Sequence, residues 1–345
     1  MKVFITGGAG FIGCNLAHHY LAQGHTVTVF DDLSRKGTDN NLAWLRANHG
    51  DRLTFIRGDI CDFDALRAAL PPDAERVFHM AGQVAVTTSV ADPRSDFKAN
   101  ALGTFNVLEA VRLGAPKAVV FFASTNKVYG GMEDAAVVEE ATRYRYRDFP
   151  LGIPESQLLD FHSPYGCSKG AADQYVRDYA RIYSLKTVVF RQSCIYGTRQ
   201  FGVEDQGWIA HFCIAARLGR PISIYGNGKQ VRDVLWIDDL VCAYDAAAAR
   251  IDVASGQIYN IGGGPDNTMS IWGEFGPILE RLAGKAIPMT YADWRPGDQP
   301  VYISDIRKAE RELGWQPRVS MSEGIERLWR WVGANSELFQ QIGGR

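Results

Sequence analysis

The sequence predicts an α/β protein with a doubly wound parallel sheet and a smaller C-terminal α+β domain. Three observations lead to this fold class. Short apolar, β-branched runs alternate with longer helical patterns in the first half, glycines crowd the first strand–helix junction, and the alternation fades after residue 192. Alternating strand and helix units form parallel sheets with helices on both faces. A chain of 345 residues is long enough for one large core or for two domains that share one.

The expected elements follow the chain in order. Buried strands are predicted at 2–6, 26–30, 53–56, 76–80, 118–124 and 187–191. Helical patterns between them cover 11–24 and 99–114, and the second pattern ends at a glycine, a helix stop signal. From residue 192, glycine and proline interrupt segments such as "RPISIYGNGKQ". We therefore expect a first domain over 1–191 that carries the catalytic residues, and a loop-rich second domain over 192–345, interwoven with it over the carboxyl edge of the sheet.

Composition and charge exclude several classes of function. The chain is 46% apolar and 22% charged, and its net charge is −2 with scattered basic residues, so neither nucleic acid nor a membrane surface is expected as a partner. The six cysteines form no Cys-x-x-Cys pair and the histidines show no metal-ligand spacing. The cysteine pattern favours a protein of a reducing compartment, and the two patterns together predict no metal site. No signal peptide or membrane span is recognisable, so we expect a soluble, cytoplasmic protein.

The segment "VFITGGAGFIG" predicts a Rossmann-type phosphate loop. Gly7, Gly10 and Gly13 follow the first strand and open a helix, where glycines permit a tight turn, close approach to a pyrophosphate and close helix–strand packing. The second strand ends at Asp31, whose carboxylate would bind the adenosine ribose and repel a 2′-phosphate, so NAD is favoured over NADP. Arg35 and Lys36 keep NADP open as an alternative.

A tyrosine–lysine pair predicts acid–base chemistry. Tyr165 precedes Lys169 by one helical turn, so both side chains share a helix face and the ammonium favours the phenolate. Such help is needed because the unperturbed pKa of tyrosine is ~10. Ser124 and Thr125 place hydroxyl groups where the fifth strand ends. A helix-face pair without a catalytic role is the alternative interpretation.

Together these motifs resemble the extended short-chain dehydrogenase/reductase family, and the similarity includes "HMAGQ" at 79–83 and "LGWQP" at 313–317. The resemblance implies that Thr125 supplies a hydroxyl to the substrate, Tyr165 acts as acid and base, and Lys169 tunes it and binds the nicotinamide ribose. Many relatives carry a basic residue where this chain has Gln83. The implied contacts of NAD are Gly7, Gly10, Phe11, Ile12, Gly13, Asp31, Asp32, Ser34, Arg35, Asp59, Ile60, Ala81, Gly82, Gln83, Asn100, Ser124, Tyr165 and Lys169.

Family members oxidise a nucleotide-sugar hydroxyl with tightly held NAD and later return the hydride, and the intervening step depends on other residues. Sugar 4,6-dehydratases carry Asp-Glu directly after the catalytic threonine, whereas this chain has Asn126 and Lys127. An amide and an ammonium do not supply the same carboxyl acid and carboxylate base, so dehydration is disfavoured. Lys127 has two open interpretations, as an electrostatic contact to substrate or pyrophosphate and as one partner of a structural ion pair.

Segments from "DDLSRKGTDNNLAWL" to "GNGKQVRDVL" are similar to the CDP-sugar 2-epimerases of this family. The resemblance implies an isomerase that acts on a CDP-hexose. A 4-epimerase, an NAD(P)-dependent nucleotide-sugar reductase and a non-catalytic NAD or sugar sensor remain alternatives. By analogy the chain forms a homodimer or homotetramer through 94–113 and 165–184. The implied substrate contacts are Thr87, Ser89, Asn126, Lys127, His162, Ser163, Arg199, Gln200, Gln206, Trp208, Arg232, Arg295 and Asp298.

Overall fold

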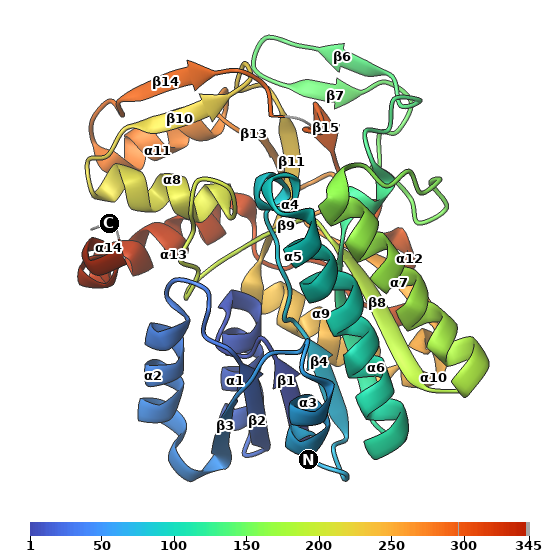
Figure 1. Ribbon diagram of the computed structural model, residues 1–345. Helices are drawn as coiled ribbons and strands as arrows, with labels where there is room; N and C mark the ends of the chain where they lie inside the picture. The colour runs from blue at the N-terminus through green and yellow to red at the C-terminus, as the bar shows by residue number, and fades with distance from the viewer. Residues whose placement is uncertain (296, 343–345) are drawn as a thin grey trace.

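A seven-stranded parallel sheet forms the centre of the computed structural model, which describes residues 1–295 and 297–342 (Figure 1). Its strand order is β12-β8-β5-β4-β1-β2-β3, and every neighbouring pair is parallel. The predicted α/β class and all six predicted strands are confirmed. The strands are β1 (Lys2–Thr6), β2 (Thr26–Asp31), β3 (Leu53–Arg57), β4 (Arg76–His79), β5 (Val119–Thr125), β8 (Lys186–Gln192) and β12 (Gln257–Ile261).

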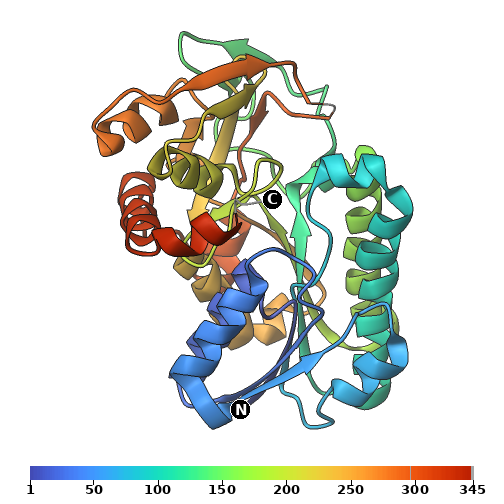
Figure 2. The same cartoon turned by 60° about the vertical axis from the view of Figure 1, so that its left-hand side comes forward.

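Helices cover both faces of this sheet because its strands alternate their side chains between two apolar cores (Figure 2). Phe121 of β5 belongs to the core on one face and Phe122 to the core on the other. The first core is closed by α1 (Phe11–Ala22), α2 (Thr38–His49) and α9 (Ile237–Ala249), and the second by α3 (Phe63–Ala69), α6 (Gly103–Gly114) and α7 (Ser163–Tyr183).

The helix predicted at 99–114 begins differently in the structure. A π-helical turn, Lys98–Leu102, joins α5 (Pro93–Phe97) to α6, and α4 (Val86–Ala91) precedes them. The wider turn buries Asn100, whose amide nitrogen donates to the Gln83 carbonyl at 3.0 Å. π-turns of this kind are frequent at functional sites, and this one ties the helix to the loop after β4.

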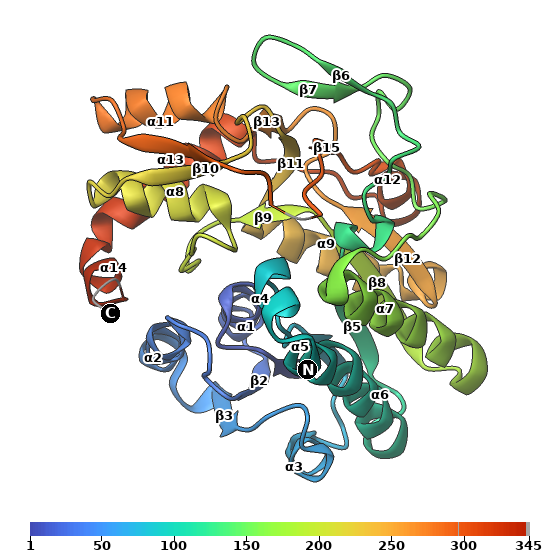
Figure 3. The same cartoon turned by 45° about the horizontal axis from the view of Figure 1, so that its top comes forward.

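The second half of the chain contains more regular structure than the predicted loop-rich domain. Two small sheets, β10-β14 and β13-β11-β15 with β9 beside β11, lie over the carboxyl edge of the main sheet (Figure 3). Their strands are β9 (Cys194–Tyr196), β10 (Ile222–Tyr225), β11 (Val231–Trp236), β13 (Thr268–Ser270), β14 (Met289–Ala292) and β15 (Val301–Tyr302). The helices of this half besides α9 are α8 (Trp208–Arg217), α10 (Ile251–Ala254), α11 (Phe275–Ala283), α12 (Arg307–Leu313), α13 (Met321–Ala334) and α14 (Ser336–Ile342).

Residues after 192 also return to the first sheet, since β12 pairs with β8. This strand was not predicted from the sequence, because a run of glycines follows it directly. The boundary at 191/192 therefore stays a prediction. A hairpin of β6 (Val137–Glu139) and β7 (Tyr144–Tyr146) projects beside the small sheets, and short 3₁₀ turns occur at Gly50–Arg52 and Asn126–Tyr129.

A buried ion pair connects β8 to α7 beneath the carboxyl edge. Arg191 donates from Nε and a terminal nitrogen to the two carboxylate oxygens of Asp173, at 2.9 and 3.0 Å, and both residues are almost fully buried. Bidentate pairing of this kind fixes the relative position of the two elements. Of the helices in the part of the chain that the structure describes, none is both long and apolar enough to cross a membrane.

Candidate active site

The loop between β1 and α1 has a backbone shape that only glycine allows. Gly7 has a φ of +69°, and a Cβ added there would lie 2.5 Å from the Ala81 nitrogen. A Cβ on Gly13 would overlap the Gly7 carbonyl oxygen. The first turn of α1, capped by Gly10, carries no acidic residue, so its free N–H groups and its dipole suit an anionic phosphate. The loop therefore fits a dinucleotide pyrophosphate.

The predicted ribose segment lies at the end of β2. Asp31 is almost buried, and its carboxylate accepts the N–H groups of Ala9 at 3.0 Å and Leu33 at 2.9 Å. Burial raises the pKa of Asp31, and these backbone donors oppose that shift. Asp32 accepts from the Ser34 hydroxyl at 2.7 Å. These contacts hold a carboxylate beside the glycine loop, which is the arrangement that a ribose diol requires.

Only some of the other predicted cofactor residues line the cavity. Ala81 and Gly82 line the cavity described below, together with Phe11 and Ile12. Gln83 instead donates from its side-chain amide to the Ala85 carbonyl at 2.6 Å and to Asp96 at 3.2 Å. Ile60 packs against Gly103, Asp59 accepts the Cys61 N–H at 2.8 Å, and Arg35 lies close enough to Tyr165 to lower the pKa of that phenol.

A cavity of about 370 Å³ opens over the carboxyl ends of β4, β5 and β8. Tyr165, Lys169 and Thr125 line it at one end, and Tyr225 and Arg295 line it at the other. Its size falls within the range of small-molecule sites. Ligands of doubly wound folds bind outside the carboxyl ends of the strands, where this cavity lies.

Tyr165 and Lys169 form a buried acid–base pair at the start of α7. Burial raises the pKa of Tyr165 to about 12, and a hydrogen bond with the Thr125 hydroxyl partly opposes this shift. Burial lowers the pKa of Lys169 to about 7, against the attraction of Asp173 and Asp96. The Lys169 Nζ lies 4.2 Å from the centroid of the Phe122 ring. A phenol beside a hydroxyl, one helical turn from a lysine, is suited to exchange a proton with a substrate alcohol.

Two predicted site residues form hydrogen bonds to α7, the helix that carries this pair. The Ser124 hydroxyl donates to Asp173 at 2.8 Å, and the Ser89 hydroxyl accepts the backbone N–H of Tyr165 at 3.1 Å. Ser89 is fully buried. The structure thus gives Ser89 a contact to the helix that carries Tyr165.

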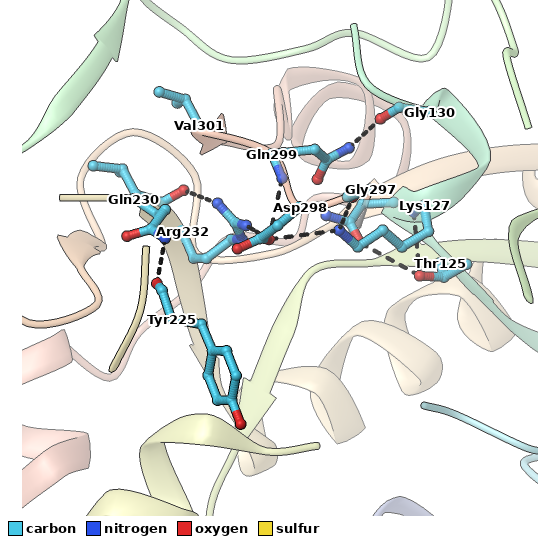
Figure 4. A network of polar contacts seen from close by, with 12 residues as sticks. Thr125, Lys127, Gly130, Tyr225, Gln230, Arg232, Gly297, Asp298, Gln299 and Val301 are labelled. Atoms are coloured by element: carbon cyan, nitrogen blue, oxygen red, sulfur yellow. Dashed lines mark hydrogen bonds and ion pairs between the residues drawn. The ribbon is translucent and has the colours of Figure 1, made fainter. Parts of the chain in front are cut away.

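A network of charges crosses the middle of the cavity (Figure 4). The Asp298 carboxylate accepts from Arg232 at 2.6 Å and lies 4.0 Å from the Lys127 Nζ, which also donates to the Gly297 carbonyl at 3.3 Å. Burial, followed by the charge of Arg232, lowers the pKa of Lys127 to about 8. Lys127 is therefore part of an ion-pair network and also lines the cavity. Both interpretations of this residue have a contact in the structure.

Sequence reasoning missed the residues that hold Arg295. Its guanidinium lies 3.8 Å from the centroid of the Tyr225 ring and pairs with Asp205 at 3.0 Å. Tyr225 donates to Glu204 at 2.6 Å. The only signal for Tyr225 was the short apolar run "ISIY", which does not indicate what its aromatic ring would contact.

Other predicted substrate residues fall into two groups. The first group lines the cavity and consists of Thr87, Asn126, Gln200, Gln206 and Trp208. Arg199, in contrast, stacks on Trp44 at 4.0 Å, His162 lies against Gly297, and Ser163 accepts the Gly166 N–H at 3.2 Å. These three have contacts that explain their positions without a substrate, and their predicted roles stay predictions.

Residues 4–328 match the model of the family described as GDP-mannose 4,6 dehydratase. The chain belongs to this family. It is 45% identical to the CDP-paratose 2-epimerase of Salmonella typhi over 342 residues, which cover 97% of this chain and 100% of that protein. It is 32% identical to the UDP-glucose 4-epimerase of Mycolicibacterium smegmatis, over 94% of this chain and 96% of that one.

Solved structures of the family share the fold. The dTDP-glucose 4,6-dehydratase of Streptomyces venezuelae, solved with NAD bound, gives a TM-score of 0.85 at 29% identity and covers 99% of this chain and all of its own. The UDP-glucuronic acid 4-epimerase of Bacillus cereus was solved with UDP-glucuronic acid and NAD. It gives a TM-score of 0.82 at 29% identity and covers 97% of this chain and 99% of its own. The predicted membership of the extended short-chain dehydrogenase/reductases is confirmed.

Replacing Gly13 by alanine should destabilise the protein, because the added Cβ overlaps the Gly7 carbonyl oxygen. We expect the free energy of unfolding, measured by urea denaturation, to fall by about 2 kcal/mol or more. Gly114→Ala is the matched control, since its Cβ would meet only Leu70 at 3.8 Å and alanine favours helix. Equal stability of the two variants would contradict the tight packing of the loop.

Proposed function

We propose that this protein is an NAD-dependent isomerase, a nucleotide-sugar 2-epimerase that acts on CDP-paratose or a closely related CDP-hexose. The observation that carries the proposal is the 45% identity to a CDP-paratose 2-epimerase across the full length of that protein. The cavity lined by Tyr165, Lys169 and Thr125 also supports the proposal, because side chains of these types can exchange a proton with a sugar hydroxyl. Identity at this level extends well beyond the residues that the fold alone requires.

The residues around the glycine loop fit NAD. Gly7 and Gly13 admit a pyrophosphate against the backbone, Asp31 suits the adenosine ribose, and Lys169 suits the nicotinamide ribose. The family members from Streptomyces venezuelae and Bacillus cereus were solved with NAD. When bound, NAD accepts the hydride of the sugar carbon and later returns it, so the reaction has no net redox change.

The protein's own residues move the proton. Tyr165, as phenolate, removes the proton of the C2 hydroxyl while the C2–H bond breaks and a 2-keto sugar forms. Lys169 stabilises the phenolate by its charge, and Thr125 donates a hydrogen bond to the sugar oxygen. The sugar then reorients so that the ketone presents its opposite face. Tyr165 returns the proton to the oxygen while the hydride returns to C2, and the C2 epimer results.

The cations of the cavity suit the diphosphate of a nucleotide sugar. Arg232 and Arg295 line the cavity, and so does Lys127, whose Nζ lies 4.0 Å from Asp298. Guanidinium groups bind phosphate oxygens in pairs. Thr87, Gln200 and Trp208 line the cavity, and each has a buried polar side-chain atom without a hydrogen-bond partner among the described residues.

The proposal is tested by proton NMR of the purified protein, without added cofactor, in D₂O with CDP-paratose and with other CDP-, UDP- and GDP-hexoses. We expect a new C2 epimer that carries no deuterium at C2. Deuterium at C2 would indicate enolisation and contradict internal hydride return. A C4 epimer of a UDP-sugar would favour the 4-epimerase alternative, and net NAD(P)H consumption would favour a reductase.

Removal of the phenol hydroxyl should abolish most of the activity. In Tyr165→Phe we expect the rate to fall ~10²–10⁴-fold, the scale of a positioned acid–base group, with NAD still bound after purification. Tyr291→Phe is the matched control, because this tyrosine lies on β14, does not line the cavity and is 57% exposed. Unchanged epimerisation by Tyr165→Phe would contradict the catalytic role.

We also propose that two copies of the chain pair through α5, α6 and α7. Large apolar side chains exposed on these helices, and on the π-helical turn between α5 and α6, are Phe97, Leu102, Phe105, Leu113, Tyr175, Ile182 and Tyr183. Exposed apolar patches of this kind usually mark an interface. Light scattering should give a mass of two or four chains, and Ile182→Glu should lower it, whereas Tyr291→Glu, at another exposed site, on β14, should not. A monomeric mass for the unaltered protein would contradict this assembly.

A cytoplasmic location completes the proposal. All six cysteines are free thiols in the structure, and Cys14 and Cys213 are fully buried. Free thiols are typical of reducing compartments. Cell fractionation followed by immunodetection should recover the protein with cytoplasmic markers, and recovery with membranes or in the medium would contradict it.

A further inference from the structure

Lys127 lines the cavity next to the hydroxyl of Thr125, and the proposed proton transfer does not use it. Thr125 is the last residue of β5, and the 3₁₀ turn that contains Lys127 follows directly. The backbone N–H of Lys127 donates to the Thr125 hydroxyl at 3.3 Å, so the two residues are fixed relative to each other. Any group that the Lys127 ammonium binds is therefore within the length of one lysine side chain of Thr125.

The ammonium of Lys127 has unused capacity to bind an anion. Its only hydrogen bond to the described part of the chain goes to the Gly297 carbonyl, at 3.3 Å. The carboxylate oxygen Oδ1 of Asp298 lies 4.0 Å away, beyond hydrogen-bond distance, and the same oxygen accepts from Arg232 at 2.6 Å. A lysine ammonium has further N–H donors. These donors are open to a ligand in the cavity.

Two cations share one carboxylate at this place, since Lys127 and Arg232 both pair with Asp298 (Figure 4). Burial, followed by the charge of Arg232, lowers the pKa of Lys127 to about 8, so the ammonium is still the main form at neutral pH. Cys194 also acts on Lys127, but burial raises the pKa of this thiol and keeps it uncharged. The excess positive charge suits a phosphate group.

The covalent structure of a nucleotide sugar limits where its phosphate can lie. The diphosphate is attached to C1, which is bonded directly to C2, whereas C4 lies on the opposite side of the ring. When the C2 hydroxyl is held by Tyr165 and Thr125, the sugar-linked phosphate is only a few atoms from Thr125. When the C4 hydroxyl is held there, the width of the ring separates them. Lys127, which is bonded to Thr125, suits the first placement.

We propose that Lys127 is a specificity-determining residue, whose ammonium binds the sugar-linked phosphate and thereby places C2, and not C4, at Tyr165. The proposal rests on the proposed 2-epimerase function and extends it to the selection of one ring carbon. The Gly297 carbonyl and Asp298 hold the Lys127 side chain in the cavity. Lys127 breaks no bond of the sugar, because its role is to bind and to place the substrate.

Replacing Lys127 by methionine removes the ammonium and keeps the length of the side chain. Titration calorimetry on the purified holoenzyme compares CDP, which retains the phosphate that carries the sugar, with CMP, which lacks it. We expect the affinity for CDP to fall about tenfold or more, the scale of a lost charge-assisted hydrogen bond, and the affinity for CMP to change less than about twofold. Lys127→Arg, which keeps the charge, should retain most of the difference between the two nucleotides.

Steady-state epimerisation of CDP-paratose separates binding from the selection of the carbon. Loss of a contact that only anchors the phosphate would raise KM and leave kcat unchanged. We expect kcat of Lys127→Met to fall about tenfold as well, because a sugar that binds in several placements presents C2 less often.

Lys308→Met is the matched control for both measurements. Lys308 also donates to a backbone carbonyl, that of Ile258 at 2.9 Å, but it does not line the cavity. Its CDP affinity, KM and kcat should equal those of the unaltered protein.

Equal losses of CDP and CMP affinity in Lys127→Met, no loss of either, or an unchanged kcat would overturn the proposal. A structural role alone would lower the melting temperature and leave the ratio of the two affinities as it is, which would also overturn it. If thermal unfolding indicates that Lys127→Met does not fold, Lys127→Gln is measured in the same way.

Failure of the proposed function is recognised in the unaltered protein. A C2 epimer formed there, without a CDP-specific loss in Lys127→Met, would overturn this inference and leave the 2-epimerase standing. No epimer from any sugar, together with a CDP-specific loss, would count against the 2-epimerase and leave the phosphate contact standing. A C4 epimer would contradict both. If the protein binds UDP and not CDP, UDP and UMP replace the cytidine nucleotides in the same comparison.

Discussion

The buried pair of Arg191 and Asp173 is the interaction on which the site depends. It joins the end of β8 to α7 beneath the carboxyl edge of the sheet, and Asp173 also accepts the Ser124 hydroxyl at the end of β5. Three elements far apart in sequence are thereby held in one arrangement. Loss of either charge would leave the other buried without a partner, which is strongly destabilising. This constraint sets where Tyr165 and Lys169 meet the crevice.

Burial shifts the pKa values of Tyr165 and Lys169, and both shifts work against the catalytic role proposed for this pair. The same low-polarity surroundings raise the pKa of Tyr165 to about 12 and lower that of Lys169 to about 7. Both shifts oppose the charged forms that proton transfer requires. The carboxylates near Lys169 and the Thr125 hydroxyl beside Tyr165 act in the opposite direction. In the proposed enzyme, the protein therefore uses charges and hydrogen bonds around the pair, and not exposure to water, to keep it reactive.

The sequence predicted much of the fold, and Thr125, Tyr165 and Lys169, which it singled out, line one cavity in the structure. All six strands were found because buried parallel strands leave continuous apolar runs, and the glycine loop and the Tyr165–Lys169 spacing are local patterns. The strand β12 was missed because a glycine run follows it. Arg199 and Gln83 were predicted to contact ligands. In the structure Arg199 stacks on Trp44 and Gln83 bonds to Ala85 and Asp96, so their ligand contacts stay predictions. A side chain's type indicates which contacts it can make, but not which of several competing partners it reaches.

The sequence by itself determined the α/β class and the glycine pattern of the phosphate loop, and it singled out Tyr165 and Lys169 as a candidate acid–base pair, since each follows from residue types at short spacing. The tertiary structure alone decided which charges surround that pair. Asp96, Asp173 and Arg191 come from α5, α7 and β8, and their separation in sequence carries no information about distance. Electrostatic interactions depend on distance and burial, and both are set only when the helices pack onto the sheet.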